Sequence, residues 1–119
     1  MPSKPSNPKA YLLHIRDNIT LARRFVDGFE FERFRDDPLV FYGVVRALEI
    51  VSEASKRLPP TMKARHPEIA WKDVAGAGSV YRHDYEDVRQ RDVWTTVQKH
   101  LPSLLAAVQE ELRRLEESS

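Results

Sequence analysis

The chain has 119 residues, of which 41% are hydrophobic and 31% are charged, a balance typical of one soluble globular domain. It contains no cysteine, which excludes disulfides, thiolate metal ligands and a cysteine nucleophile. The net charge of +1 does not by itself indicate a nucleic-acid partner. No run approaches the roughly 20 apolar residues that cross a bilayer, and the start MPSKPSNPKA lacks the apolar core of a secretory signal, so we expect a cytoplasmic protein with no membrane partner.

The N-terminal part is predicted to be a short arm followed by a first helix. Residues 1–7 are rich in proline and serine, so we expect a flexible arm, with residues 8–119 forming a single domain. Asn7-Pro8 is typical of an N-cap followed by proline at the first helical position. A helical period of apolar residues then continues to a stop signal at Gly28. Its members are Tyr11, Leu12, Ile15, Ile19, Ala22 and Val26.

Three phenylalanines precede a second helix start. Phe29, Phe31 and Phe34 are predicted to form one helical turn that fills the core. The pair Asp37-Pro38 then repeats the pattern of an N-cap followed by proline. We expect this second long helix to run to about residue 57.

The apolar stripe of this second helix is wider than one partner helix needs. The helix is either central in a bundle, or it packs in the bundle and also across a dimer. Because a chain of 119 residues has little room for a helix that is buried all round, we favour the second explanation. It predicts a homodimer interface that includes Val44, Leu48 and Val51.

Two further helices are predicted on either side of the middle of the chain. A short basic helix over residues 61–66, capped by Thr61, follows the proline pair that ends the second helix. The last helix is expected to start with Asp92 as its N-cap and to continue to the C-terminus. Pro102 is expected to kink or briefly break it. The sequence therefore predicts an all-α bundle of four or five helices.

Between these helices, a helix is predicted from about residue 71 to residue 83. Gly76 and Gly78 would each weaken an isolated helix by about 1 kcal/mol relative to alanine. Such glycines usually mark the close approach of another helix or of a ligand, and crowding between helices is the commoner cause. The surrounding residues 56–91 carry eight basic and five acidic side chains. This mildly basic region could meet phosphate, or it could be a solvated surface of mixed charge.

The only concentrated set of reactive side chains lies at the end of this predicted helix. It is Arg82-His83-Asp84-Tyr85. A histidine can transfer protons near neutral pH, an arginine can hold a phosphate through two hydrogen bonds, and a tyrosine can stack on a base. These types suit RNA cleavage without a metal, although from residue types alone a surface arginine and a helix-capping histidine are the commoner interpretation. The four histidines have no metal-ligand spacing, so we expect no metal and no cofactor.

The order of residues over most of the chain resembles the HepT-like group of HEPN-domain proteins. Residues 71–76 read WKDVAG and residues 83–85 read HDY, as in the tryptophan-to-HxY segment of that group. The segment VWTTV at residues 93–97, followed by LPSL at 101–104, fits the part beyond it. RALEIVSEA at residues 46–54 is similar to the family's RxxxIIGEA run. The resemblance covers nearly the whole chain after the arm, in the right order.

This resemblance implies a HEPN-like fold, a homodimer and a ribonuclease toxin. Active members resemble metal-independent endoribonucleases that use an RxxxxH pattern in a dimer cleft, which would make His83 and Arg82 the catalytic residues here. The family also implies an antitoxin partner, a nucleotidyltransferase of the MntA type, that adenylylates the tyrosine of HxY, here Tyr85. RNA or a nucleotide is expected to contact Arg82, Asp84, Tyr85 and Ser79.

One position departs from the family pattern. The arginine of RxxxxH should stand five residues before His83, where this chain has Gly78. Arg82 is the nearby replacement, but neighbours on a helix point about 100° apart. In a dimer, Arg82 of one subunit could approach His83 of the other. If it does not, the alternative is a HEPN module that binds RNA, a nucleotide or a partner without catalysis.

Overall fold

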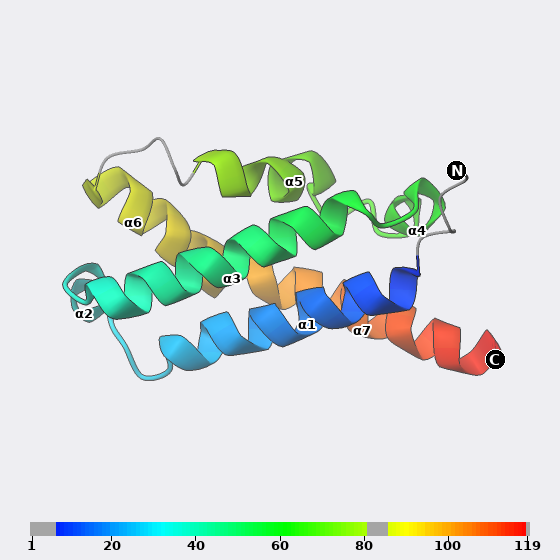
Figure 1. The fold of residues 1–119 in the computed structure, drawn as a ribbon, viewed down its shortest axis with the longest axis horizontal. Helices are drawn as coiled ribbons and strands as arrows, with labels where there is room; N and C mark the ends of the chain where they lie inside the picture. The colour runs from blue at the N-terminus through cyan, green and yellow to red at the C-terminus, as the bar shows by residue number, and fades with distance from the viewer. Residues whose placement is uncertain (1–6, 81–85, 119) are drawn as a thin grey trace, which may run out of the picture.

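The computed structural model in Figure 1 describes residues 7–80 and 86–118, with the backbone alone for residues 78–80 and 86–88. Within these ranges every regular element is a helix. The elements are α1 (Pro8–Phe25), α2 (Phe31–Arg35), α3 (Pro38–Lys56), α4 (Pro60–Ala64), α5 (Trp71–Val80), α6 (Glu86–Thr95), the π-helix η1 (Thr96–His100) and α7 (Leu101–Ser118). The predicted all-α fold class is confirmed. No described helix is long and apolar enough to cross a membrane.

The two long N-terminal helices begin where their capping residues predict. The Asn7 side chain accepts a hydrogen bond from the backbone N–H of Lys9 at 3.1 Å, and Pro8 occupies the first helical position. The Asp37 side chain accepts from the backbone N–H of Val40 at 3.1 Å, again with a proline at the first position. Each cap satisfies a donor that the first helical turn leaves without a partner. The chain leaves α1 through Gly28, whose φ of 78° is a left-handed conformation that favours glycine.

The helix α3 is the centre of the bundle. Figure 1 shows α3 between α1 and α5, and it packs against both of them, while α7 packs against α1. The core between these helices is made of aliphatic side chains. Its fully buried members include Leu12, Ile15, Ile19, Val44, Val93 and Val108. The wide apolar stripe of α3 is therefore explained by two partner helices within one chain.

This arrangement corrects the predicted dimer interface. Val44, Leu48 and Val51 are 0%, 3% and 2% exposed in the single chain. Side chains that their own chain already covers leave no surface for a second copy. A central position for α3 was set aside because the chain is short, yet α1 and α5 together cover it. The large apolar side chains that α3 does expose are Leu39 and Tyr42, which are 84% and 63% exposed.

The short helix α2 fills one end of the bundle, as predicted, but Phe29 precedes it instead of belonging to it. Phe34 is fully buried, and its ring lies 5.7 Å from the ring of Phe41 and 5.3 Å from the ring of Trp94. Phe31 meets Trp94 edge to face at 6.2 Å. Aromatic rings at these separations attract each other beyond the area that they bury. This cluster joins α2, α3 and α6 at the same end of the molecule (Figure 1).

Two predicted helix starts are wrong. The helix α4 begins at Pro60, with Pro59 as its N-cap and no side-chain cap, so Thr61 lies inside it. Asp92 also lies inside a helix, because α6 already runs from Glu86. Contacts between α6 and α2 supply the reason: Gln90 donates from Nε2 to the carbonyl oxygen of Arg35 at 3.2 Å. Such tertiary contacts override local capping signals.

A π-helix stands where the last helix was expected to kink. The N–H of Leu101 donates to the carbonyl oxygen of Thr96, five residues earlier, and α7 continues directly from η1. Pro102 has no N–H and therefore interrupts the regular hydrogen bonding of the helix backbone. The wider π-helical turn lies just before this proline. The predicted irregularity is present, as one wide turn rather than a break.

Candidate functional site

The predicted reactive residues occupy the connection between α5 and α6. Arg82, His83, Asp84 and Tyr85 lie outside the described residues, between the last residue of α5, Val80, and the first of α6. Gly78 and Ser79 belong to α5, but only their backbone is described. The structure therefore defines the two helix ends that hold this connection.

The start of α5 is attached to the turn after α4. The indole Nε1 of Trp71 donates to the carbonyl oxygens of Lys63 and His66, at 3.0 and 3.1 Å. One turn further along, the hydroxyl of Ser52 in α3 donates to the carbonyl oxygen of Ala75 at 2.7 Å. Ser52 is 3% exposed, so water does not compete for this bond. These contacts fix α5 against α3.

The same turn is bound to α7 through a buried carboxylate. Glu111 is 2% exposed and accepts from Nη2 and Nε of Arg65, at 2.6 and 3.1 Å. The ring Nε2 of His66 lies 2.7 Å from Glu111 Oε2. Hydrogen bonding to Arg65 lowers the pKa of Glu111, against the opposing effect of burial, and His66 lowers it further. A charged Glu111 therefore links α7 to the turn that carries Trp71.

The start of α6 is held by arginine–ring contacts as well as by Gln90. The guanidinium carbon of Arg91 lies 4.5 Å from the centroid of the Phe31 ring. The guanidinium carbon of Arg89 lies 4.9 Å from the centroid of the Phe41 ring, in α3. A cation over a ring face is attracted by the ring's negative face. Both ends of the 81–85 connection are therefore attached to the core, one through α3 and the other through α2 and α3.

At Gly76 the structure excludes crowding against another helix, the commoner of the two predicted causes of a glycine there. A Cβ built on Gly76 would meet nothing within 4 Å, so no neighbouring helix requires glycine there. The close approach lies instead at Gly43 in α3, where a Cβ would stand 3.2 Å from the Phe25 ring of α1. The sequence signal for that contact was a lone glycine inside a wide apolar stripe. Gly78, the other predicted position, lies among the residues without described side chains.

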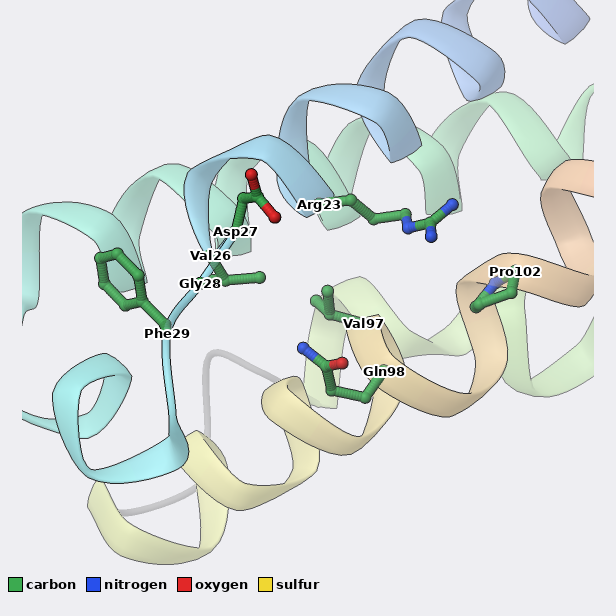
Figure 2. Close-up of a pocket in the computed structure, with 8 residues that line it drawn as sticks. All are labelled: Arg23, Val26, Asp27, Gly28, Phe29, Val97, Gln98 and Pro102. Atoms are coloured by element: carbon green, nitrogen blue, oxygen red, sulfur yellow. The ribbon is translucent and has the colours of Figure 1, made fainter.

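Several clefts open on the described surface. Figure 2 shows one of about 190 Å³, lined by Arg23 of α1 and the residues that follow this helix on one side and by Val97, Gln98 and Pro102 on the other. It is smaller than the several hundred Å³ typical of small-molecule sites. A second cleft, of about 350 Å³, runs between α5 and the η1–α7 segment. Its lining includes Asp73, Val74, Ala77, His100 and Leu104. Neither lining contains a residue predicted from the sequence to act on a substrate.

An all-α bundle is the fold class that the HEPN resemblance implies. The sequence profile of the Ribonuclease HepT-like family matches residues 15–111, from the middle of α1 to α7. The chain belongs to this family. No solved structure gave a significant match.

Individual relatives agree with this assignment. The chain is 36% identical over 107 residues to the "Putative RNase TTE0752" of Caldanaerobacter subterraneus subsp. tengcongensis, covering 90% of this chain and 96% of the relative. It is 41% identical over 96 residues to the "Probable ribonuclease HepT" of Thermococcus cleftensis, covering 81% of this chain and 87% of the relative. These relatives are similar along nearly their full length, so the likeness is not limited to one motif.

Proposed function

We propose that this protein is a metal-independent endoribonuclease that cleaves RNA through His83 and Arg82. The observation that carries the proposal is the family match over residues 15–111, which spans both residues, together with relatives named as ribonucleases. The residue types at 82–85 supply a proton-transfer group and a cation, which RNA cleavage needs.

The proposed chemistry is an internal displacement at phosphorus. His83 takes the proton of a ribose 2′-hydroxyl, and the 2′-oxygen attacks the adjacent phosphorus. The bond from phosphorus to the 5′-oxygen breaks, that oxygen takes a proton from water, and His83 later returns its own proton to the solvent. Arg82 stabilises the negative charge that develops on the non-bridging oxygens. The products are one fragment with a 2′,3′-cyclic phosphate and one with a free 5′-hydroxyl.

The ends of the fragments test this mechanism. The full-length protein would be incubated with transfer RNA and messenger RNA in EDTA. Fragments that carry a cyclic phosphate and a 5′-hydroxyl are expected. Fragments with 5′-phosphate ends, or cleavage that EDTA abolishes, would exclude the proposed displacement.

We further propose that the protein acts as a homodimer and as the toxin of a two-gene pair. Leu39 and Tyr42, exposed at the start of α3, replace the buried residues first assigned to the interface. α3 and α6 begin at the same end of the bundle, so an interface there would bring the starts of the two α6 helices toward each other (Figure 1). Large exposed apolar side chains of this kind are typical of contact surfaces.

The proposed antitoxin is a nucleotidyltransferase of the MntA type that modifies Tyr85. The tyrosine oxygen would attack the α-phosphorus of ATP, forming a tyrosyl–AMP bond and releasing pyrophosphate. Intact-mass measurement after incubation with that partner and ATP should show one added adenylyl group. Tyr85→Phe should abolish the addition, and Tyr11→Phe, a change at a partly buried tyrosine of α1, should not. Equal labelling of both variants would assign the modification elsewhere.

A second candidate function rests on Gly78. Without an arginine at that position, the protein could bind RNA, a nucleotide or its partner and not cleave. That function predicts saturable RNA binding with no fragments at any enzyme concentration. Growth arrest on expression that disappears with His83→Ala would count against it.

A further inference from the structure

Arg89 occupies a position of α6 that faces the protein interior. Val93 is fully buried, and Arg89 lies four residues before it, on the same face of the helix. A helical period extended backward from Val93 would therefore predict an apolar residue at 89. A permanently charged side chain stands there instead.

The contacts of Arg89 leave one buried donor without a partner. Its guanidinium lies over the ring of Phe41, which is only 6% exposed. Its Nε is buried and has no hydrogen-bond partner in the part of the chain that the structure describes. Buried N–H groups are almost always paired, and an unpaired one on a charged group is costly. The Nε of Arg89 therefore requires an acceptor that the described chain does not supply.

The other arginines near this end of the bundle differ from Arg89. Arg35 is paired with the carboxylate of Asp36 at 2.9 Å. Arg33 and Arg91 also lie over phenylalanine rings, at 3.9 and 4.5 Å, but both side chains are exposed to water. Among the described side chains, only that of Arg89 has a buried nitrogen without a hydrogen-bond partner. This difference makes Arg91 a matched control on the same helix.

The place of Arg89 connects it to the proposed site. α6 begins at Glu86, the residue that follows the 81–85 connection, and Arg89 is three residues further on. That spacing is about 4.5 Å of helical rise. The position at which the family pattern has an arginine, 78, is glycine in this chain. Arg82 is the cation of the proposed cleavage, and Arg89 is a second cation, fixed near the start of α6 just after the 81–85 connection.

We infer that Arg89 binds a phosphate group of the RNA substrate, as a second cation beside the proposed catalytic Arg82. A phosphate oxygen would accept a hydrogen bond from the buried Nε, and a second oxygen would accept from the outer nitrogen on the same edge of the guanidinium. The Phe41 ring would hold the plane of the guanidinium in place. This inference rests on the proposed ribonuclease function for its substrate, but the phosphate site can be tested separately.

RNA binding at several salt concentrations tests the inference. The probe is a fluorescent RNA oligonucleotide whose 2′-hydroxyls are methylated, so that cleavage does not interfere. Arg89→Gln should weaken binding about tenfold to a hundredfold. It should also reduce the slope of log affinity against log salt by about 0.7, the value for one phosphate contact on a single strand. Arg89→Lys should restore much of that slope, because it restores the charge.

Arg91→Gln removes the same charge from the same helix and is the control. It should weaken binding by no more than about threefold, as expected for an exposed charge. Equal effects of Arg89→Gln and Arg91→Gln would overturn the inference, because general attraction would then explain both. The inference would also be overturned if Arg89→Gln lowered the melting temperature and Arg89→Lys did not recover binding. Arg89 would then have the structural role of packing on the Phe41 ring.

Cleavage of unmodified RNA, measured beside binding, separates this inference from the proposed function. If the natural chain cleaves RNA and Arg89→Gln changes neither cleavage nor binding, the phosphate site is wrong and the ribonuclease proposal stands. If the natural chain cleaves nothing while Arg89→Gln still weakens binding selectively, the phosphate site stands and the ribonuclease proposal is wrong.

Discussion

At the scale of single residues, Glu111 shows how a remote side chain supports the site. It is buried in α7, yet its carboxylate binds Arg65 and His66, whose turn accepts the hydrogen bonds of Trp71. A neutral amide at 111 could keep the shape of these contacts but not their charge. Because Arg65 would then lose its ionic partner, the loss in the free energy of unfolding should exceed the loss from breaking an exposed ion pair.

Glu111→Gln is expected to lower the free energy of unfolding by about 2 kcal/mol near neutral pH. The folded-state pKa of Glu111 is lowered, mainly by Arg65, so its contribution to stability is present above its ordinary value of 4.5 and is lost as pH falls through the lower folded value. When pH falls from neutral to below 4.5, the variant should therefore lose less stability than the natural chain. Urea denaturation at about pH 7 and at about pH 3.5 measures the difference. Glu117→Gln, an exposed change on the same helix, should act like the natural chain; equal losses in both variants would contradict the assignment.

At the scale of the helices, α5 carries a glycine, Gly76, that packing within the described chain does not explain. Gly76 is exposed, and a Cβ there would enter open space. Glycine in a helix costs conformational entropy that alanine does not. The structure therefore predicts that the helix leading to the 81–85 connection is less stable than its packing against α3 would allow.

Gly76→Ala should raise the free energy of unfolding by about 0.5–1 kcal/mol. Gly28→Ala provides the opposite control, because Gly28 has a φ of 78° and alanine there should cost about 1 kcal/mol. Thermal denaturation should show a higher melting temperature for Gly76→Ala and a lower one for Gly28→Ala. A destabilised Gly76→Ala variant would mean that the residue meets a neighbour that the single chain does not contain.

Much of the helical layout follows from local signals. Asn7-Pro8 and Asp37-Pro38 predicted α1 and α3 because a cap and a proline act within one turn. The start of α6 could not be predicted in that way, since Gln90 and Arg89 form their contacts with α2 and α3, distant in sequence. Arg89 was missed for the same reason: its buried Nε becomes visible only when Phe41 is placed beside it. The site residues at 82–85 were singled out by their side-chain types, and the family resemblance then favoured a catalytic role for them; their geometry stays a prediction.

At the scale of the whole molecule, the proposed dimer must use surface that the bundle leaves open. α1 and α5 cover the two sides of α3, so its exposed apolar residues are confined to its start and its outer edge. Leu39 and Tyr42 are three residues apart on α3 and lie on one face.

Replacing Leu39 and Tyr42 together by serine should weaken the dimer without unfolding the protomer. Both side chains are exposed in the single chain, so the stability of the protomer should change by no more than about 0.5 kcal/mol for each. Val44→Ala should do the reverse, costing about 1–3 kcal/mol of stability at a fully buried position and leaving association unchanged. Light scattering over a dilution series gives the association state. A natural chain that is monomeric at micromolar concentration would remove the dimer, and an unchanged dimer in the double variant would place the interface elsewhere.

The proposed function depends most on whether His83 carries out proton transfer during RNA cleavage. The direct measurement is the single-turnover rate of RNA cleavage in EDTA for the natural chain, for His83→Ala and for His100→Ala, an exposed histidine of η1. We expect His83→Ala to slow cleavage by about a hundredfold or more, the usual contribution of a general acid–base residue, and His100→Ala to leave the rate unchanged. Equal rates for His83→Ala and the natural chain would contradict the proposed mechanism.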